Sequence, residues 1–166
     1  MGGRNDLVLS GTEMRAHTIT GTTQDQTTGA VDIIGVAGSA GTAGNILVGN
    51  AKHDNVQTLR AEGSTLTADG DLTLSMMRAA RTAGATTLRT TTQALAGGIT
   101  FAGNGVAALA RETGSMTMNL MRGSALSAAG SLVLKTDNRA NIQAETKSLS
   151  ASLLAAATAT YASASF

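Results

Sequence analysis

The feature that most constrains this chain is an internal repeat of about 60 residues. Residues 63–74 read GSTLTADGDLTL and residues 123–134 read GSALSAAGSLVL, which agree at 7 of 12 positions. A shorter copy, DLVLS at 6–10, matches DLTLS at 71–75. A fixed period of this kind is typical of chains that stack one supersecondary unit on the next. We therefore divide the 166 residues, as one segment, into three approximate units: 1–62, 63–122 and 123–166.

A second pair of segments supports the repeat. AGNILVGN at 43–50 can be set beside GGITFAGN at 97–104. This alignment places Gly44, Gly49 and Asn50 opposite Gly98, Gly103 and Asn104.

Within the repeat, apolar residues occupy every second position, as in Leu72 and Leu74, and this is the periodicity of strands. Asp69-Gly70 is a turn signal, and Ala129-Gly130 keeps the glycine whose unrestricted φ suits a corner. Short strands with tight corners and small residues predict a β-solenoid. We expect two or three coils per unit. Six to eight coils, each rising about 4.8 Å, would then project roughly 30–40 Å.

The same alternation predicts which side chains face the interior. Those expected inside are Leu66, Leu72, Leu74, Leu126, Leu132, Leu134, Ile46, Val48, Ile99 and Phe101. Thr73 and Val133 are expected outside.

Three alanine-rich stretches leave a helical alternative open, namely 75–84, 104–113 and 149–164. The last stretch alternates Ala with Thr around Tyr161 and favours a strand. For 104–113 a short helix remains an alternative, because Val106, Leu109 and Ala110 would share one helical face.

Composition limits the interior and the partners. Ala, Gly, Thr and Ser make up 88 residues, and there are only two Phe, one Tyr and no Trp, so the interior must be narrow. A net charge of +1 supplies no drive toward nucleic acid or anionic lipid. No apolar run approaches the roughly 20 residues needed to span a bilayer, and without Cys there are no disulfides or zinc–thiolate sites.

The repeat GS-x-L-x-A-x-G-[DS]-L-x-L, followed by an Ala/Thr-rich alternating tract, resembles repeats of filamentous-haemagglutinin-like and leukotoxin-type filamentous bacterial adhesins. The resemblance covers residues 42–166 well and 1–41 loosely. It implies an all-β fold, a right-handed parallel β-helix built from about 60-residue repeats. The calcium-binding nonapeptide G-G-x-G-x-D is absent, and GVAGSAGTAGN at 35–45 has smaller side chains than a haemagglutinin stalk.

Gly103-x-Gly105-x-x-Ala108 matches a dinucleotide-binding fingerprint, but residues 121–128 lack the acidic residue that would hold a ribose. We therefore interpret Gly103 and Gly105 as coil corners. His17 and His53 lack the ligand set of a metal site and are expected in solvated loops.

Asp69 and Asp71 could offer two carboxylates to Ca²⁺ or to acid–base chemistry. We prefer turn aspartates that accept hydrogen bonds from their own backbone, because the next copy has Ala129 and Ser131. Clusters of Thr could form an ice-binding face, but they do not recur from unit to unit. The candidate residues are Thr65, Thr67, Thr86, Thr87, Thr90, Thr91 and Thr92. A basic stripe lacks the aromatic residues that stack bases and is interpreted as solvated surface; its members are Arg78, Arg81, Arg89, Arg111, Arg122 and Arg139.

The sequence thus predicts no catalytic, cofactor-binding or metal-binding residue. We expect a non-catalytic, structural and adhesive segment of a secreted or cell-surface bacterial β-helical filament. The alternative is a trimeric β-helical spike segment of a phage tail or secretion apparatus. Expected partners are neighbouring repeats or copies of the chain stacked end to end, covering Tyr161 and Phe166, and a host or cell-surface receptor, but neither nucleic acid nor an inserted membrane.

Overall fold

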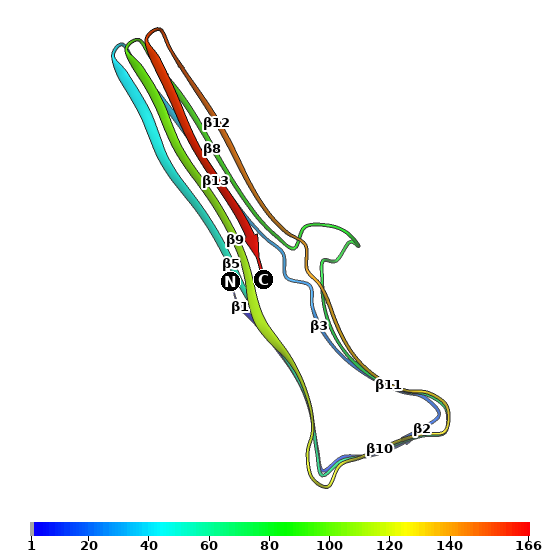
Figure 1. The fold of residues 1–166 in the computed structure, drawn as a ribbon. Coiled ribbons are helices and arrows are strands. Elements are labelled where there is room, and N and C mark those ends of the chain that lie inside the picture. The colour runs from blue at the N-terminus through cyan, green and yellow to red at the C-terminus, as the bar shows by residue number, and fades with distance from the viewer. Residues whose placement is uncertain (1) are drawn as a thin grey trace. The chain divides into compact units, whose positions relative to one another are not determined.

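A computed structural model describes residues 2–166, which form thirteen β-strands and no helix (Figure 1). The strands are β1 (Gly2–Ser10), β2 (Glu13–Ala16), β3 (Ile19–Asp25), β4 (Gly29–Ser39), β5 (Thr42–Glu62), β6 (Thr65–Ala68), β7 (Leu72–Ala79), β8 (Leu88–Gly98), β9 (Phe101–Leu120), β10 (Ala125–Ala128), β11 (Leu132–Arg139), β12 (Ile142–Ser152) and β13 (Ala155–Ser165). The three alanine-rich stretches are therefore not helical: residues 75–79 lie in β7, 104–113 lie in β9, and most of 149–164 lies in β12 and β13.

The strands form four sheets, with orders β1-β5-β9-β13, β10-β6-β2, β11-β7-β3 and β12-β8-β4. All the registered pairs are parallel. Each sheet joins strands from successive passes of the chain, which we call pass 1 (2–53), pass 2 (54–112) and pass 3 (113–166). The fold is all-β, with parallel strands in stacked sheets.

The sequence repeat corresponds to this stacking. Leu66 pairs with Leu126, and Leu72 pairs with Leu132, so the two copies lie on neighbouring strands as predicted. Each copy of about 60 residues is one pass, however, and not two or three coils. The predicted count of six to eight layers was wrong, because the strand periodicity in the sequence does not say how many strands complete a pass. Three layers at about 4.8 Å span only roughly 10 Å from first to last.

The passes differ in length mainly at one connection. From pass 1 to pass 2 the register offset is 52 at Glu13↔Thr65 but 59 at Gly29↔Leu88. One extra residue lies between β6 and β7, since the offset is 53 at Ile19↔Leu72. The others lie in the connection between β7 and β8, residues 80–87, which Figure 1 shows looping away from the other two passes. The matching connection in pass 3 is only residues 140–141.

The strands group into two compact units. Unit 1 contains residues 2–27, 54–85 and 113–140, and unit 2 contains 28–53, 86–112 and 141–166. The larger core lies in unit 1, where Leu59, Leu66, Leu72, Leu74 and Met76 are buried, with Met116 and Met118 packed against them. Unit 2 has a small core of Ala51, Leu88 and Ala110. In unit 2, the turns that join β4 to β5, β8 to β9 and β12 to β13 stack on one another (Figure 1).

The predicted facing of the GSTL repeat is confirmed in pass 2. Leu66, Leu72 and Leu74 are buried, whereas Thr73 is partly exposed. Leu126 is half-buried in pass 3, and Val133 is exposed as expected. Leu132 and Leu134 are exposed as well, although their ladder partners in β7 are buried.

The predicted facing of the second segment pair was wrong. Ile46, Val48, Ile99 and Phe101 are all exposed, and Ile46 is 89% exposed. Alternation does not say which face of a strand is buried, and in β5 the inner positions hold the small residues Ala43 and Ala51. The alignment of the two segments was wrong as well, because Asn45 Nδ2 donates to Asn104 Oδ1 at 3.1 Å. The equivalent segments are therefore TAGN at 42–45 and FAGN at 101–104. The offset between the segments is thus 59 residues, from Asn45 to Asn104, and not the predicted 54, from Asn50 to Asn104.

The glycine corners also differ from the prediction. Gly11, Gly63 and Gly123 adopt φ of 58°, 55° and 85°, each after the first strand of its pass. Gly70 has no such φ; a Cβ there would lie 2.8 Å from the carbonyl oxygen of His17. The repeat therefore needs its leading glycine for backbone conformation and its second glycine for close contact.

Candidate functional site

The inner face of pass 3 is the most unusual surface of unit 1. Leu72 is 0% exposed, but its partner Leu132 is 49% exposed; Leu74 is 1% exposed, but its partner Leu134 is 45% exposed. β11 is the last strand of its sheet, so no strand among residues 2–166 covers it on that side. Two leucines whose counterparts form the core are thus open to solvent.

In unit 2 several inner positions of pass 3 carry small side chains. Ser148 is opposite Ala94, and Thr158 and Thr160 are opposite Asn104 and Val106. Ser148 Oγ is buried and has no hydrogen-bond partner among the described residues. Thr158 and Thr160 are exposed. The open end of this unit is therefore sparsely filled.

The end formed by pass 1 is built differently. Gly21 lacks a side chain, and the Leu7 side chain occupies the space above it, 3.1 Å from the position a Cβ would take. In unit 2, Leu47 fills the space at Gly35 in the same way, at 2.6 Å. Ile19 in pass 1 is only 5% exposed. Large side chains opposite glycines thus cover the interior at pass 1.

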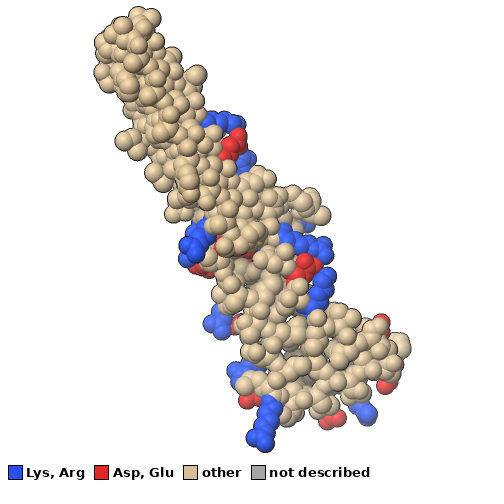
Figure 2. Space-filling view, viewed as in Figure 1, with Lys and Arg blue, Asp and Glu red and all other residues tan. Residues whose placement is uncertain are grey.

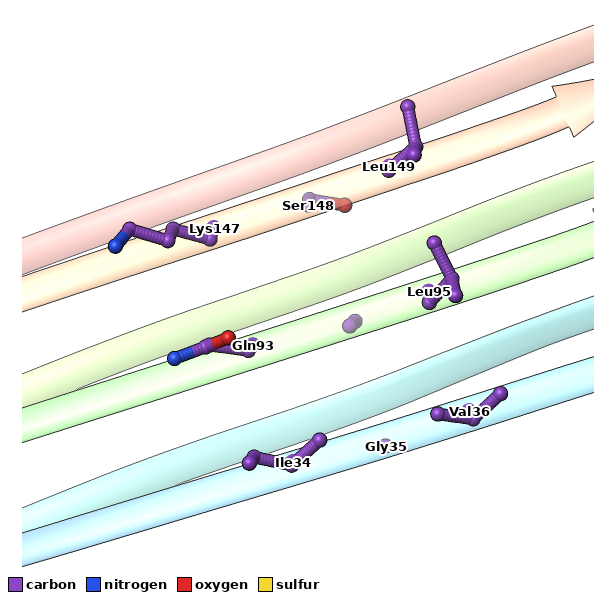
Figure 3. A pocket seen from close by; sticks show the side chains of 9 residues that line it. Ile34, Gly35, Val36, Gln93, Leu95, Lys147, Ser148 and Leu149 are labelled. Atoms are coloured by element: carbon purple, nitrogen blue, oxygen red, sulfur yellow. The ribbon is translucent and has the colours of Figure 1, made fainter.

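The outer face of unit 2 carries an apolar ladder across β4, β8 and β12. Val36 pairs with Leu95, and Leu95 pairs with Leu149, so the three side chains stand in one column (Figure 3). Beside them, Ile34 precedes the polar Gln93 and Lys147 in a second column. A shallow groove of about 330 Å³ lies among these residues. All four apolar side chains are exposed.

The outer face of β5, β9 and β13 in unit 2 is also apolar but is lined by small residues. Gly103, Gly105, Ala157 and Ala159 lie between Phe101 and Ile46 in a depression of about 560 Å³. A Cβ at Gly103 would lie 2.7 Å from the Phe101 ring, so the ring lies over that glycine.

Unit 2 has few charged residues. Residues 33–51, 90–110 and 148–166 contain no Lys, Arg, Asp or Glu. Figure 2 shows the same uncharged surface over the turns that join β4 to β5, β8 to β9 and β12 to β13. This surface cannot attract a charged partner by ion pairing, so its contacts would be apolar or hydrogen-bonded without charge.

The dinucleotide-like segment does not form a turn before a helix. Gly103, Asn104 and Gly105 lie inside β9, so the prediction that the glycines are coil corners was also wrong. Asn104 points inward and donates to Leu149 O at 2.8 Å and to Ser150 Oγ at 3.0 Å. The segment therefore forms a polar contact between passes.

The two histidines lie in different surroundings. His17 is exposed, and its carbonyl oxygen accepts the Gly70 N–H at 2.8 Å. His53 is 1% exposed, which contradicts its predicted place in a solvated loop. It lies within an inward-facing row of alternate residues in β5 that continues to Ala61.

Asp69 and Asp71 are both exposed and flank a bend, as predicted. Asp71 Oδ1 accepts the Ser131 N–H at 2.8 Å, so its partner is the next pass and not its own turn. Among residues 2–166, no group of three His, Asp or Glu side chains is arranged to hold a metal ion.

The arginine and threonine candidates separate by burial. Arg78 is fully buried, 3.9 Å from Asp25 Oδ2, and so does not belong to a solvated stripe, whereas the other five arginines of that set are exposed. Thr87, Thr90, Thr91 and Thr92 are buried and cannot present a surface ladder. The Asp25–Arg78 pair was missed by the sequence reasoning, because the two residues are 53 apart and only the register of β3 on β7 brings them opposite.

The comparisons with known proteins add no relative: no family model matches the chain, and no curated protein and no solved structure matches it significantly. Among the described residues, no helix is long and apolar enough to cross a membrane.

Proposed function

We propose that this chain is a non-catalytic, structural and adhesive segment of a β-helical filament, a right-handed parallel β-solenoid, on the surface of a bacterium or secreted from it. The observation that carries the proposal is the exposure of Leu132 and Leu134 opposite the buried Leu72 and Leu74. Half-exposed leucines in this position are explained if a further layer of strands covers pass 3.

Two further observations support a filament. Each sheet ends in an unpaired parallel edge at pass 1 and at pass 3, and such edges are templates for additional strands. The outer faces of unit 2 are apolar and uncharged, which suits contact with neighbouring filaments or with an apolar patch on a cell-surface receptor.

The trimeric spike is less favoured. In an intertwined trimer, a strand takes its sheet neighbours from other chains. Here β6, β7 and β8 each lie between two strands of their own chain, one from the pass before and one from the pass after.

The test is the state of the purified chain as its concentration rises. The proposal expects masses that grow with concentration and end-to-end fibres in electron micrographs, with a fibre-diffraction spacing of about 4.8 Å along the axis. A chain that stays monomeric at high concentration, or one that forms only a closed trimer, contradicts the filament.

A further inference from the structure

We infer that growth of the filament is directional, an inference that rests on the proposed function. Pass 1 of one copy covers pass 3 of another, in the register that already joins the passes within a chain. The inference concerns the partner of the open end, which is a second copy of this chain presenting its opposite end.

The first argument is the volume of inner side chains in unit 1. Ile19, Leu72 and Leu132 form one ladder across the passes, and Gly21, Leu74 and Leu134 form the next. Continued in the same register, a second copy would place its Ile19 on Leu132, as Ile19 already lies on Leu72, and its Gly21 on Leu134. A Cβ at Gly21 would lie 2.8 Å from Leu74 Cδ2, so this glycine already leaves room for a neighbouring leucine on one side.

In unit 2 the sizes are reversed. The register pairs Ile33 with Thr92 and Thr92 with Thr146, so Ile33 of a second copy would meet Thr146. Asn45 contacts Asn104, which pairs with Thr158; two residues further along, Leu47 of a second copy would therefore meet Thr160. Large residues at the pass 1 end thus meet small ones at the pass 3 end, and the sparsely filled end is filled.

A two-fold contact between like ends does not give this match. It would set the leucines of pass 3 against themselves in unit 1 and small residues against small residues in unit 2, leaving voids. It would also pair edge strands antiparallel, whereas all registered pairs within the chain are parallel. A contact between unlike ends repeats without closing and produces a filament.

The unpaired backbone groups at the two open edges are in register with each other. Ile19 N–H donates to Asp71 O at 3.0 Å, and Leu72 N–H donates to Ser131 O at 2.9 Å. Because successive residues of a strand direct their N–H and C=O groups to opposite neighbours, Thr20 directs its groups away from β7 at the outer edge of β3. By the same alternation, Leu132, Leu134 and Thr136 direct theirs away from β7 at the outer edge of β11. The outward-directed residues of β3 and β11 are thus the counterparts of the residues of β7 that hydrogen-bond to its two neighbouring strands.

The experiment blocks one edge at a time. The pass 1 variant is Thr20→Pro with Ile34→Pro, and the pass 3 variant is Thr136→Pro with Thr146→Pro. In unit 2, Gly29 N–H donates to Thr87 O and Leu88 N–H donates to Asn141 O, so by alternation Ile34 and Thr146 direct their N–H groups to the open edges. Each proline therefore removes an N–H that points to an open edge. The matched controls, Thr20→Val with Ile34→Val and Thr136→Val with Thr146→Val, keep every N–H. Far-UV circular dichroism establishes that each variant is folded.

Sedimentation is then measured on each variant and on an equal mixture, at a concentration where the wild-type chain forms multimers. We expect each proline variant alone to remain a 16.6 kDa monomer, the mixture to form a heterodimer of twice that mass, and the valine controls to assemble like wild type. A proline variant that dimerises alone, or a mixture that stays monomeric, overturns the directional contact while leaving the filament standing. A wild-type chain that never associates overturns both.

Discussion

Leu74 and Leu134 lie opposite each other on the neighbouring strands β7 and β11, yet Leu74 is 1% exposed and Leu134 is 45% exposed. Pass 1 and pass 3 cover Leu74 on both sides, whereas Leu134 is covered by pass 2 alone. The same residue at the same point of the repeat therefore differs in environment only through its place in the stack.

This difference predicts unequal costs for the same substitution. Leu74→Ala removes a fully buried side chain and should lower the free energy of unfolding by about 3 kcal/mol. Leu134→Ala should cost about 1 kcal/mol, because roughly half of its apolar area is already in water. Urea denaturation of the monomer measures both. Equal losses would show that Leu134 is covered in the isolated chain.

The contact between Leu47 and Gly35 predicts a coupled pair. A Cβ at Gly35 would lie 2.6 Å from Leu47 Cδ1, so Gly35→Ala should destabilise the chain by about 1–3 kcal/mol through overpacking. Leu47→Val in the same chain should recover part of that loss. A double-mutant cycle measures the coupling, and additive effects would show that the two residues do not share this space. Gly38→Ala is the control, since nothing lies within 4 Å of a Cβ there.

The buried pair of Asp25 and Arg78 predicts a large loss of stability when one of the two charges is removed. Arg78 lies 3.9 Å from Asp25 Oδ2, and both side chains are buried. Arg78→Met leaves the Asp25 carboxylate without this partner and should cost about 3–5 kcal/mol, whereas Arg78→Met with Asp25→Leu should cost less. Arg81→Met, at an exposed position, should change stability by no more than about 0.5 kcal/mol. Thermal or urea unfolding ranks the three variants, and a single variant no worse than the double one would contradict the pairing.

On β11, Asp137 accepts hydrogen bonds from Arg139 at 2.6 Å and Lys135 at 3.1 Å, and these bonds hold its pKa below the ordinary value of 3.8. Since the folded pKa is depressed, its contribution to stability is present above the unfolded pKa and is lost as the pH falls through the folded pKa. Arg139→Gln should raise the Asp137 pKa toward 3.8. A carboxyl NMR titration measures both chains; an unchanged pKa would show that the Arg139 bond does not form in solution.

How far the fold could be predicted differs from segment to segment. The alignment of the GSTL and GSAL copies predicted correctly that Leu66 lies opposite Leu126, because seven identical positions allow only one alignment. Ile46 and Val48 were predicted to face inward because apolar residues alternate there, but alternation does not say which face of a strand is buried, and Ala43 and Ala51 hold the inner positions instead. For the candidate site, the sequence predicted that the open ends of the stack bind partners. It did not predict that the two ends differ, with Leu7 covering Gly21 at one end and Leu134 exposed at the other, because this depends on which strands end the sheets.

The sequence by itself determined the all-β periodicity, the repeat and the narrow interior, because alternation and side-chain size are local properties of the chain. The tertiary structure alone decided that each repeat is a single pass, that Arg78 meets Asp25, and that the two ends of the stack differ. These depend on the register between strands about 52–60 residues apart, which is set by the sum of many weak contacts across the sheets.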